Sequence, residues 1–159
     1  MTDARALPAV SMARLFALLE VVDRTVGPDD VYRLGQALRL DLDELLPLLE
    51  AARLLDWVVV AAGDYDLTPE GRRVARAGSR ERQRLLRARA LHLPLIAMIA
   101  RAFEHRGHVS RQTIAAALPA RFGVAEVERQ IDTAVDWGRQ AEVFDYDADA
   151  ACFHRPHRH

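Results

Sequence analysis

The sequence predicts a mainly α-helical protein with two small β-hairpins, organised as two tandem winged-helix-like modules. Apolar residues recur at helical spacing through most of the 159 residues. Two short stretches rich in β-branched or aromatic residues interrupt this spacing, and each has a turn at its centre. The order of three helices and a hairpin occurs twice, as a similarity of pattern and not of residues. We expect a linker at 1–10, module 1 at 11–78, module 2 at 79–154 and a His/Arg tail at 155–159.

Module 1 opens with two predicted helices. The first spans 11–24, with Ser11 as its N-cap, and Gly27-Pro28 ends it. Asp29 or Asp30 caps the second helix. The apolar stripe of this second helix consists of Val31, Leu34 and Leu38.

A third helix and a hairpin complete module 1. The helix extends over about 41–55, and we expect its inward-facing residues to be Leu42, Leu45, Leu46 and Leu49. The β-branched run at 56–60 and the alternating residues at 65–68 are typical of two strands joined by a turn. Thr68 and Pro69 then begin another helix, as N-cap and first helical residue.

Module 2 repeats this order more loosely. Ser79 caps an arginine-rich helix to about residue 91, and Pro94 separates it from a helix that ends at Gly107. Ser110 caps a short helix, and 124–141 forms a long one. Strands are expected at 142–146 and 151–154, around a turn at 147–149.

The composition restricts the chemistry and the cellular location. All 22 basic residues are arginine. Without lysine, neither a phosphate-binding loop of the GxxxxGK[ST] type nor a Schiff-base enzyme is possible. The lone Cys152 excludes an internal disulfide and fits a reducing cytoplasm. No apolar run approaches the roughly 18 to 20 residues of a membrane-spanning helix, and residues 1–10, with Asp3 and Pro8, lack the apolar centre of a signal peptide. We expect a cytoplasmic protein that does not insert into membranes.

Three stretches resemble the AAA-associated C-terminal domain family: DVYRLGQALRLDLDELLPLLEAARLLDW, LTPEGRRVA and EVERQIDTAVDWGRQAEVFDYDADAACF. The run QIDTAVDWGRQAEVFDYD is the most specific, and the likeness extends from about residue 10 to 154. The resemblance implies a regulatory or interaction domain that follows the ATPase subunit of nitrate/sulfonate/taurine-type ABC transporters, with no catalytic residues of its own. Here the ATPase domain is missing, and Met1 together with the tail leads us to expect a complete small protein.

The winged-helix pattern also raises DNA binding as an alternative. Duplex binding depends on basic residues that neutralise phosphates. The third helix instead carries Asp41, Asp43, Glu44 and Glu50 against Arg53, and the long helix of module 2 is acidic as well. The arginine-rich segment at 71–89 is the counterargument. Its arginines could equally be a solvated face, pair with the protein's own acidic helices, or contact an acidic protein surface.

Several residues that could form a site also have ordinary structural roles. The histidines, including His105, His108 and those of the tail, do not form a convincing metal site, so we expect no metal and no cofactor. Trp57 and Trp137 are expected to pack each hairpin against its helices; an exposed tryptophan would instead anchor a partner. The expected partner-binding residues are Asp132, Asp136, Trp137, Arg139, Arg80, Arg84 and Arg87.

These observations predict a non-enzymatic regulatory or protein-interaction module. Its expected partner is a transporter ATPase subunit or a second copy of the chain. The separation of acidic and basic segments along the chain would suit head-to-tail self-association, and a homodimer is possible. The alternative is a winged-helix transcriptional regulator that contacts DNA through the arginine-rich segment. A metal- or ligand-sensing enzyme remnant ranks third.

Overall fold

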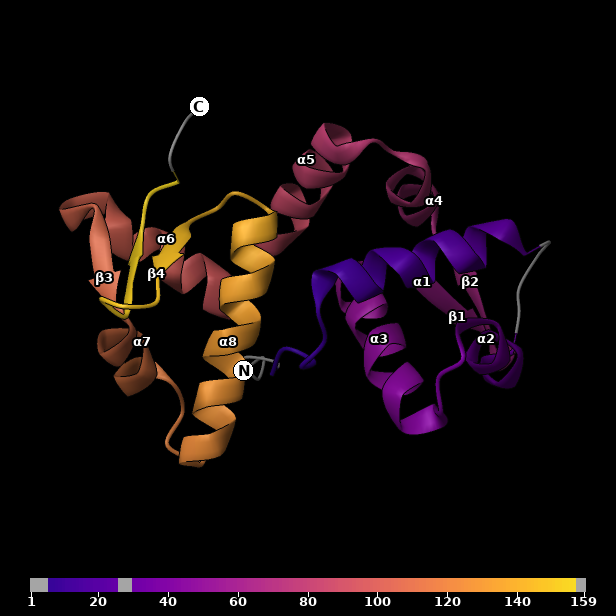
Figure 1. Ribbon diagram of the computed structural model, residues 1–159, viewed down its shortest axis with the longest axis horizontal. Helices are drawn as coiled ribbons and strands as arrows, with labels where there is room; N and C mark the ends of the chain where they lie inside the picture. Colours follow the sequence, from indigo (N-terminus) through magenta and orange to yellow (C-terminus); the bar gives the residue numbers. More distant parts are fainter. Residues whose placement is uncertain (1–5, 26–29, 157–159) are drawn as a thin grey trace. The chain divides into compact units, whose positions relative to one another are not determined.

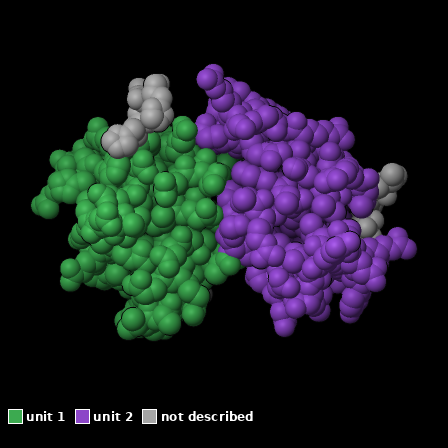
Figure 2. All heavy atoms as spheres, in the orientation of Figure 1, with its two compact units in different colours: residues 1–9, 86–159 green, residues 10–85 purple. Residues whose placement is uncertain are grey.

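Helices dominate the computed structural model, which describes residues 6–25 and 30–156 (Figure 1). Over these residues the chain forms eight helices, a two-stranded sheet and a three-stranded sheet, both antiparallel. The prediction of a mainly α-helical fold with small β-hairpins is therefore confirmed. The chain divides into two compact units: unit 1 consists of residues 1–9 and 86–159, and unit 2 of residues 10–85 (Figure 2).

Unit 2 contains four complete helices and a hairpin. The helices are α1 (Met12–Arg24), α2 (Val31–Leu38), α3 (Leu42–Leu54) and α4 (Pro69–Arg76), and the strands are β1 (Val58–Ala61) and β2 (Asp64–Leu67). Each of these helices begins with an N-cap residue whose side chain accepts a hydrogen bond from a backbone N–H of the first turn. The N-caps are Ser11, Asp30, Asp41 and Thr68. These caps satisfy donors that a helix leaves unpaired at its N-terminus.

Trp57 joins the hairpin of unit 2 to its helices, as expected. Its side chain is completely buried, and its indole N–H donates a 3.0 Å hydrogen bond to Glu70 of α4. Gly71 permits this packing, because a Cβ there would lie 1.9 Å from the carbonyl oxygen of Trp57. The core of unit 2 is otherwise aliphatic and is formed mainly by Leu15, Leu18, Leu19, Leu34, Leu45, Leu48, Leu49 and Val74.

The helix α5 (Ser79–Ala90) contains the boundary between the units, which lies between Leu85 and Leu86. The boundary expected from the sequence, at 78/79, precedes this helix. Arg82 holds the beginning of α5 beside α4, because its guanidinium donates 3.0 Å hydrogen bonds to the carbonyl oxygens of Val74 and Ala75.

Unit 1 contains one strand more than the sequence predicts. Its elements are α6 (Pro94–Arg106), β3 (His108–Ser110), α7 (Arg111–Ala117), α8 (Val124–Gln140), β4 (Asp145–Asp147) and β5 (Cys152–His154). The strand β3 pairs with β5, so the sheet order is β3-β5-β4. One face of this sheet packs inward through Val109, Phe153 and Tyr146, which are direct cross-strand neighbours.

Residues 6–9, which precede α1 in the chain, also belong to unit 1. We expected a linker at 1–10, but Leu7 is buried, and its backbone exchanges two hydrogen bonds with the side-chain amide of Gln130 in α8. The N–H of Leu7 donates to Oε1 at 2.7 Å, and its carbonyl accepts from Nε2 at 3.0 Å. The buried glutamine is thereby satisfied, as a buried amide must be.

None of the described helices combines the length and the apolar character that crossing a bilayer requires.

Candidate functional site

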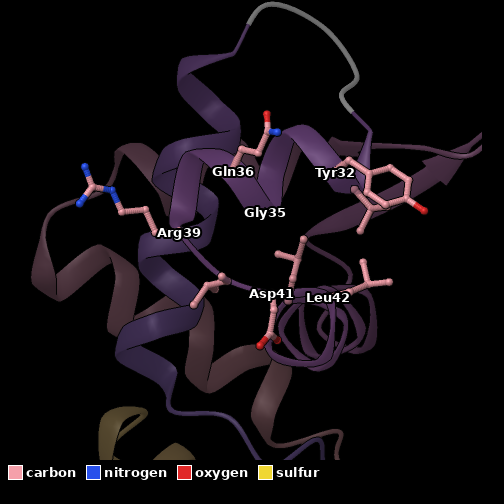
Figure 3. A pocket seen from close by; sticks show the side chains of 9 residues that line it. Tyr32, Gly35, Gln36, Arg39, Asp41 and Leu42 are labelled. Atoms are coloured by element: carbon pink, nitrogen blue, oxygen red, sulfur yellow. The ribbon is translucent and has the colours of Figure 1, made fainter.

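A hollow lies between α2 and α3 on the surface of unit 2 (Figure 3). Its volume is about 490 Å³. Apolar side chains form most of its wall, and these are Val31, Tyr32, Leu40, Leu42 and Leu45. Gln36, Arg39 and Asp41 add polar groups. In Figure 3, Tyr32 and Leu42 lie on the right of the view, whereas the guanidinium of Arg39 lies on the left and points outward.

The connection from α2 to α3 determines the shape of this hollow. Arg39 ends α2 in the left-handed conformation (φ 55°), and the N–H of Leu40 then donates to the carbonyl of Gly35 at 2.9 Å. A Cβ at Gly35 would lie 3.1 Å from the carbonyl oxygen of Leu40, so a small residue suits this close approach. Asp41 caps α3 through a 3.0 Å hydrogen bond to the N–H of Glu44. These contacts hold the two helices close while leaving the hollow open.

The exposed apolar residues beside the hollow correct one prediction about α3. We expected Leu42 and Leu46 to face inward, but their exposed fractions are 41% and 42%. The buried face of α3 consists of Leu45, Leu48 and Leu49 together with Ala51 and Ala52. Tyr32 of α2 is 72% exposed. Large apolar side chains at this density on one surface are typical of binding sites.

Carboxylates surround this apolar surface. Four carboxylates are exposed on or next to α3: Asp41, Asp43, Glu44 and Glu50. The single arginine of this helix, Arg53, is exposed too. Glu44 forms a 3.5 Å ion pair with Arg14 of α1. Asp43 and Glu50 form no ion pair with any residue in the described part of the chain. We name Tyr32, Leu42, Leu46, Asp43 and Glu50, together with the hollow, the α2–α3 face.

The site expected in unit 1 is largely occupied by contacts within that unit. Trp137 is completely buried, which fits the expected core role and leaves no surface for a partner to contact. Asp132 accepts a 2.9 Å hydrogen bond from Arg111, and Arg139 lies 3.3 Å from a carboxylate oxygen of Asp145. Both side chains remain exposed, and Asp136 is half-buried.

Arg111 is the charged centre that the sequence did not reveal. It is the first residue of α7, and its side chain is only 17% exposed and contacts α8 and Tyr146 of β4. The guanidinium donates to Glu128 at 2.7 Å, to Asp132 at 2.9 Å and to the hydroxyl of Tyr146 at 3.4 Å. Burial alone would lower the pKa of Arg111, but these hydrogen bonds outweigh burial and raise its pKa. Asp132 therefore helps to hold unit 1 together.

The three arginines expected to bind a partner are exposed on α5. Arg80 and Arg84 belong to unit 2 and Arg87 to unit 1. Arg84 pairs with Glu81, and Arg87 donates a hydrogen bond to the carbonyl of Glu142. Arg80 forms no ion pair with a residue that the structure describes.

Several titratable groups of the described residues form ion pairs that shift their pKa values. Hydrogen bonds from arginines are the main reason that the pKa values of three carboxyl groups are lowered: Asp23 by Arg76, Glu81 by Arg73, and Glu126 by Arg129. A general acid at neutral pH needs a raised pKa instead. Among the described residues, no three His, Cys, Asp or Glu side chains are placed to hold a metal ion. Cys152 is half-buried in β5.

Comparison with known proteins places the chain in a family. A family model described as the C-terminal AAA-associated domain matches residues 32–147, from α2 to β4 and well over half of the chain. No curated protein and no solved structure matches the sequence. The match agrees with the resemblance that the sequence motifs showed. The chain therefore belongs to the family of C-terminal AAA-associated domains.

Proposed function

We propose that this protein is a non-catalytic interaction module that binds another protein through the α2–α3 face of unit 2. The observation that carries the proposal is the exposure of Tyr32, Leu42 and Leu46 beside an open hollow. The partner that the resemblance of the sequence motifs implies is an ATPase subunit of a nitrate/sulfonate-type ABC transporter, which it would meet in the cytoplasm.

The apolar residues of α3 support binding to a protein. A helix normally confines its apolar residues to the face that its own domain buries, and a helix with apolar residues on further sides has a further partner. Leu42 and Leu46 lie outside the buried face of α3. Covering the exposed parts of these leucines and of Tyr32 would contribute on the order of 3 kcal/mol, enough to anchor a specific contact.

The charges on the same face argue against the DNA-binding alternative. In the winged-helix order of elements that the sequence suggests, α3 is the helix that would approach a DNA groove. Its exposed carboxylates, Asp43 and Glu50 among them, would meet the phosphate backbone with the same sign of charge. An acidic and apolar surface suits a protein surface with the opposite charge.

Co-purification tests the proposal directly. The tagged full chain would be co-expressed with the nitrate/sulfonate-type ATPase subunit encoded in the same genome, and the amount of ATPase retained would be measured. We expect the wild type to retain the ATPase, and Leu42→Asp and Leu46→Asp to lose most of it, because a charge on the apolar surface must be desolvated on binding.

A matched control is available in unit 1. Val124 is 84% exposed at the first position of α8, so Val124→Asp makes the same chemical change far from the α2–α3 face in sequence. This variant should retain the ATPase as the wild type does. Retention of the ATPase by both leucine variants would refute the proposed face, and absence of retention by the wild type would refute the ATPase as partner. ATP hydrolysis by the isolated chain would refute the non-catalytic role.

A further inference from the structure

Unit 2 carries opposite charges on two surfaces that cannot reach each other within one copy. Glu50 of α3 and Arg80 of α5 are exposed, and neither forms an ion pair with a described residue. The helix α1 packs against both α3 and α4, and Figure 1 draws these two helices on opposite sides of it. Because Arg82 holds the start of α5 beside α4, Arg80 lies on the α4 side of α1. The two charges can therefore meet only between copies.

The exposed surface of α5 is complementary to the α2–α3 face, because it combines basic and apolar side chains. Its outward residues follow one another at spacings of four, three and four positions, which places them on one side of a helix. They are Arg80, Arg84, Arg87 and Leu91, all of them exposed. Leu91 continues the helical course, since its N–H donates to the carbonyl of Arg87 at 3.1 Å. The stripe thus has three cations and, at its C-terminal end, one large apolar side chain. Arg84 already pairs with Glu81 and Arg87 already donates to the carbonyl of Glu142, so the cation without an ion pair among the described residues is Arg80.

The lengths of the two helices fit an antiparallel arrangement. At 1.5 Å per residue, Glu50 lies about 12 Å from Leu42 along α3, and Arg80 lies about 16 Å from Leu91 along α5. With Arg80 beside Glu50, Leu91 would therefore extend about one turn beyond Leu42. That position is the apolar hollow that begins at the N-terminus of α3. Arg84 and Arg87 would lie along Leu46 and Asp43, where their aliphatic stems cover apolar surface while Arg84 keeps its pair with Glu81.

We propose that the α2–α3 face binds α5 of a second copy, so that the protein associates head to tail. This inference rests on the proposed function, because it takes the α2–α3 face as a docking surface and names its occupant. Each copy contributes both surfaces, and such a heterologous contact produces rings or open chains instead of a two-fold dimer. A second copy and the ATPase would then compete for binding to the same face.

Paired charge reversals test this contact. Glu50→Arg and Arg80→Glu each place like charges together, and neither removes an ion pair from the described fold. Sedimentation velocity of the full chain at about 50 mM salt should show association of the wild type, weakened about tenfold in either variant. An equimolar mixture of the two variants should associate again, because the two reversed positions then carry opposite charges across the contact. The double variant should associate as well.

Controls with the same change in net charge separate the contact from a general charge effect. Glu104→Arg and Arg101→Glu reverse exposed charges on α6 and should leave association unchanged. A wild type that stays monomeric at about 0.1 mM protein would overturn the inference, since weak specific contacts are populated there. Association that both single reversals leave intact, or that their mixture does not restore, would overturn it too. In either case the co-purification test with Leu42→Asp still decides the proposed function separately.

Discussion

Replacing Gly138 with alanine tests how closely α8 packs against the residues that follow it. A Cβ at position 138 would lie 2.0 Å from Cζ of Phe144 and within 2.5 Å of two other ring atoms. Phe144 is 1% exposed, and its ring meets Phe103 and Phe153 edge-on, with centroids 6.3 and 5.1 Å away. The ring therefore cannot move aside without disturbing the aromatic core of unit 1.

The expected magnitude follows from two opposing effects. Forcing an extra methyl group into a close-packed core costs about 1 to 3 kcal/mol. In a helix interior, alanine is more favourable than glycine by about 1 kcal/mol. Gly138 lies in the last turn of α8 and has an ordinary helical backbone conformation, so part of this gain applies. We expect a net loss of about 1 kcal/mol in the free energy of unfolding. The double variant Gly138→Ala with Phe144→Leu should lose less than the sum of the two single changes, because the smaller side chain makes room for the methyl group.

Urea unfolding followed by tryptophan fluorescence measures this loss, since the neighbouring Trp137 is completely buried. Hydrogen exchange would assign the effect to unit 1. Gly78 provides the matched control, because a Cβ there meets nothing within 4 Å, so Gly78→Ala should be neutral or stabilising. If Gly138→Ala proved as stable as Gly78→Ala, the close approach to Phe144 would not constrain the fold, and the reasoning would be refuted.

Two further predictions concern ion pairs. Arg111→Lys should lower the free energy of unfolding by about 1 to 2 kcal/mol in urea, because one ammonium cannot replace the forked donors that reach Glu128 and Asp132. Asp23→Asn should weaken the acid dependence of stability. The pKa of Asp23 is lowered chiefly by hydrogen bonds from Arg76, so the contribution of this pair is complete above the ordinary value of 3.8 and is lost as the pH falls through the lower folded value. Denaturant titrations over this acidic range should show a steeper loss for the wild type than for the variant.

Local signals account for most of what the sequence predicted correctly. Ser11, Thr68 and Ser110 cap helices where the sequence places them, since capping depends on a side chain and a backbone N–H only a few residues apart. The strand β3 was missed because its three residues, although they alternate between exposed and buried, are too few to distinguish a strand from other structures. It becomes a strand only by pairing with β5, more than forty residues later in the chain. The contact between Leu7 and Gln130 spans 123 positions and likewise has no local pattern.

The candidate site was harder to predict than the fold. The sequence suggested the acidic surface of α8, but the partner of Asp132 is Arg111, 21 positions away, and no motif links the two. On α3 the periodicity allowed several inward faces, because leucines occur on more than one side of the helix. Only the packing of α1 and α2 against α3 determines that Leu45, Leu48 and Leu49 are buried. The excess of leucines was nevertheless a usable signal, since one face cannot bury them all.

The exposed carboxylates of α8 and of α3 differ in their contacts, and this difference supports our proposal of a docking surface on α3. In unit 1, Arg111 and Arg139 are joined to Asp132 and Asp145, so the acidic surface of α8 contributes to the unit's own stability. In unit 2, the carboxylate of Glu50 stands beside exposed leucines without such a partner among the described residues. An exposed charge beside exposed apolar surface adds little to folding, because water already solvates the charge and the leucines stay uncovered. The leucines contribute only when an apolar surface covers them, and the carboxylate only when an opposite charge faces it, which is why we propose binding at unit 2.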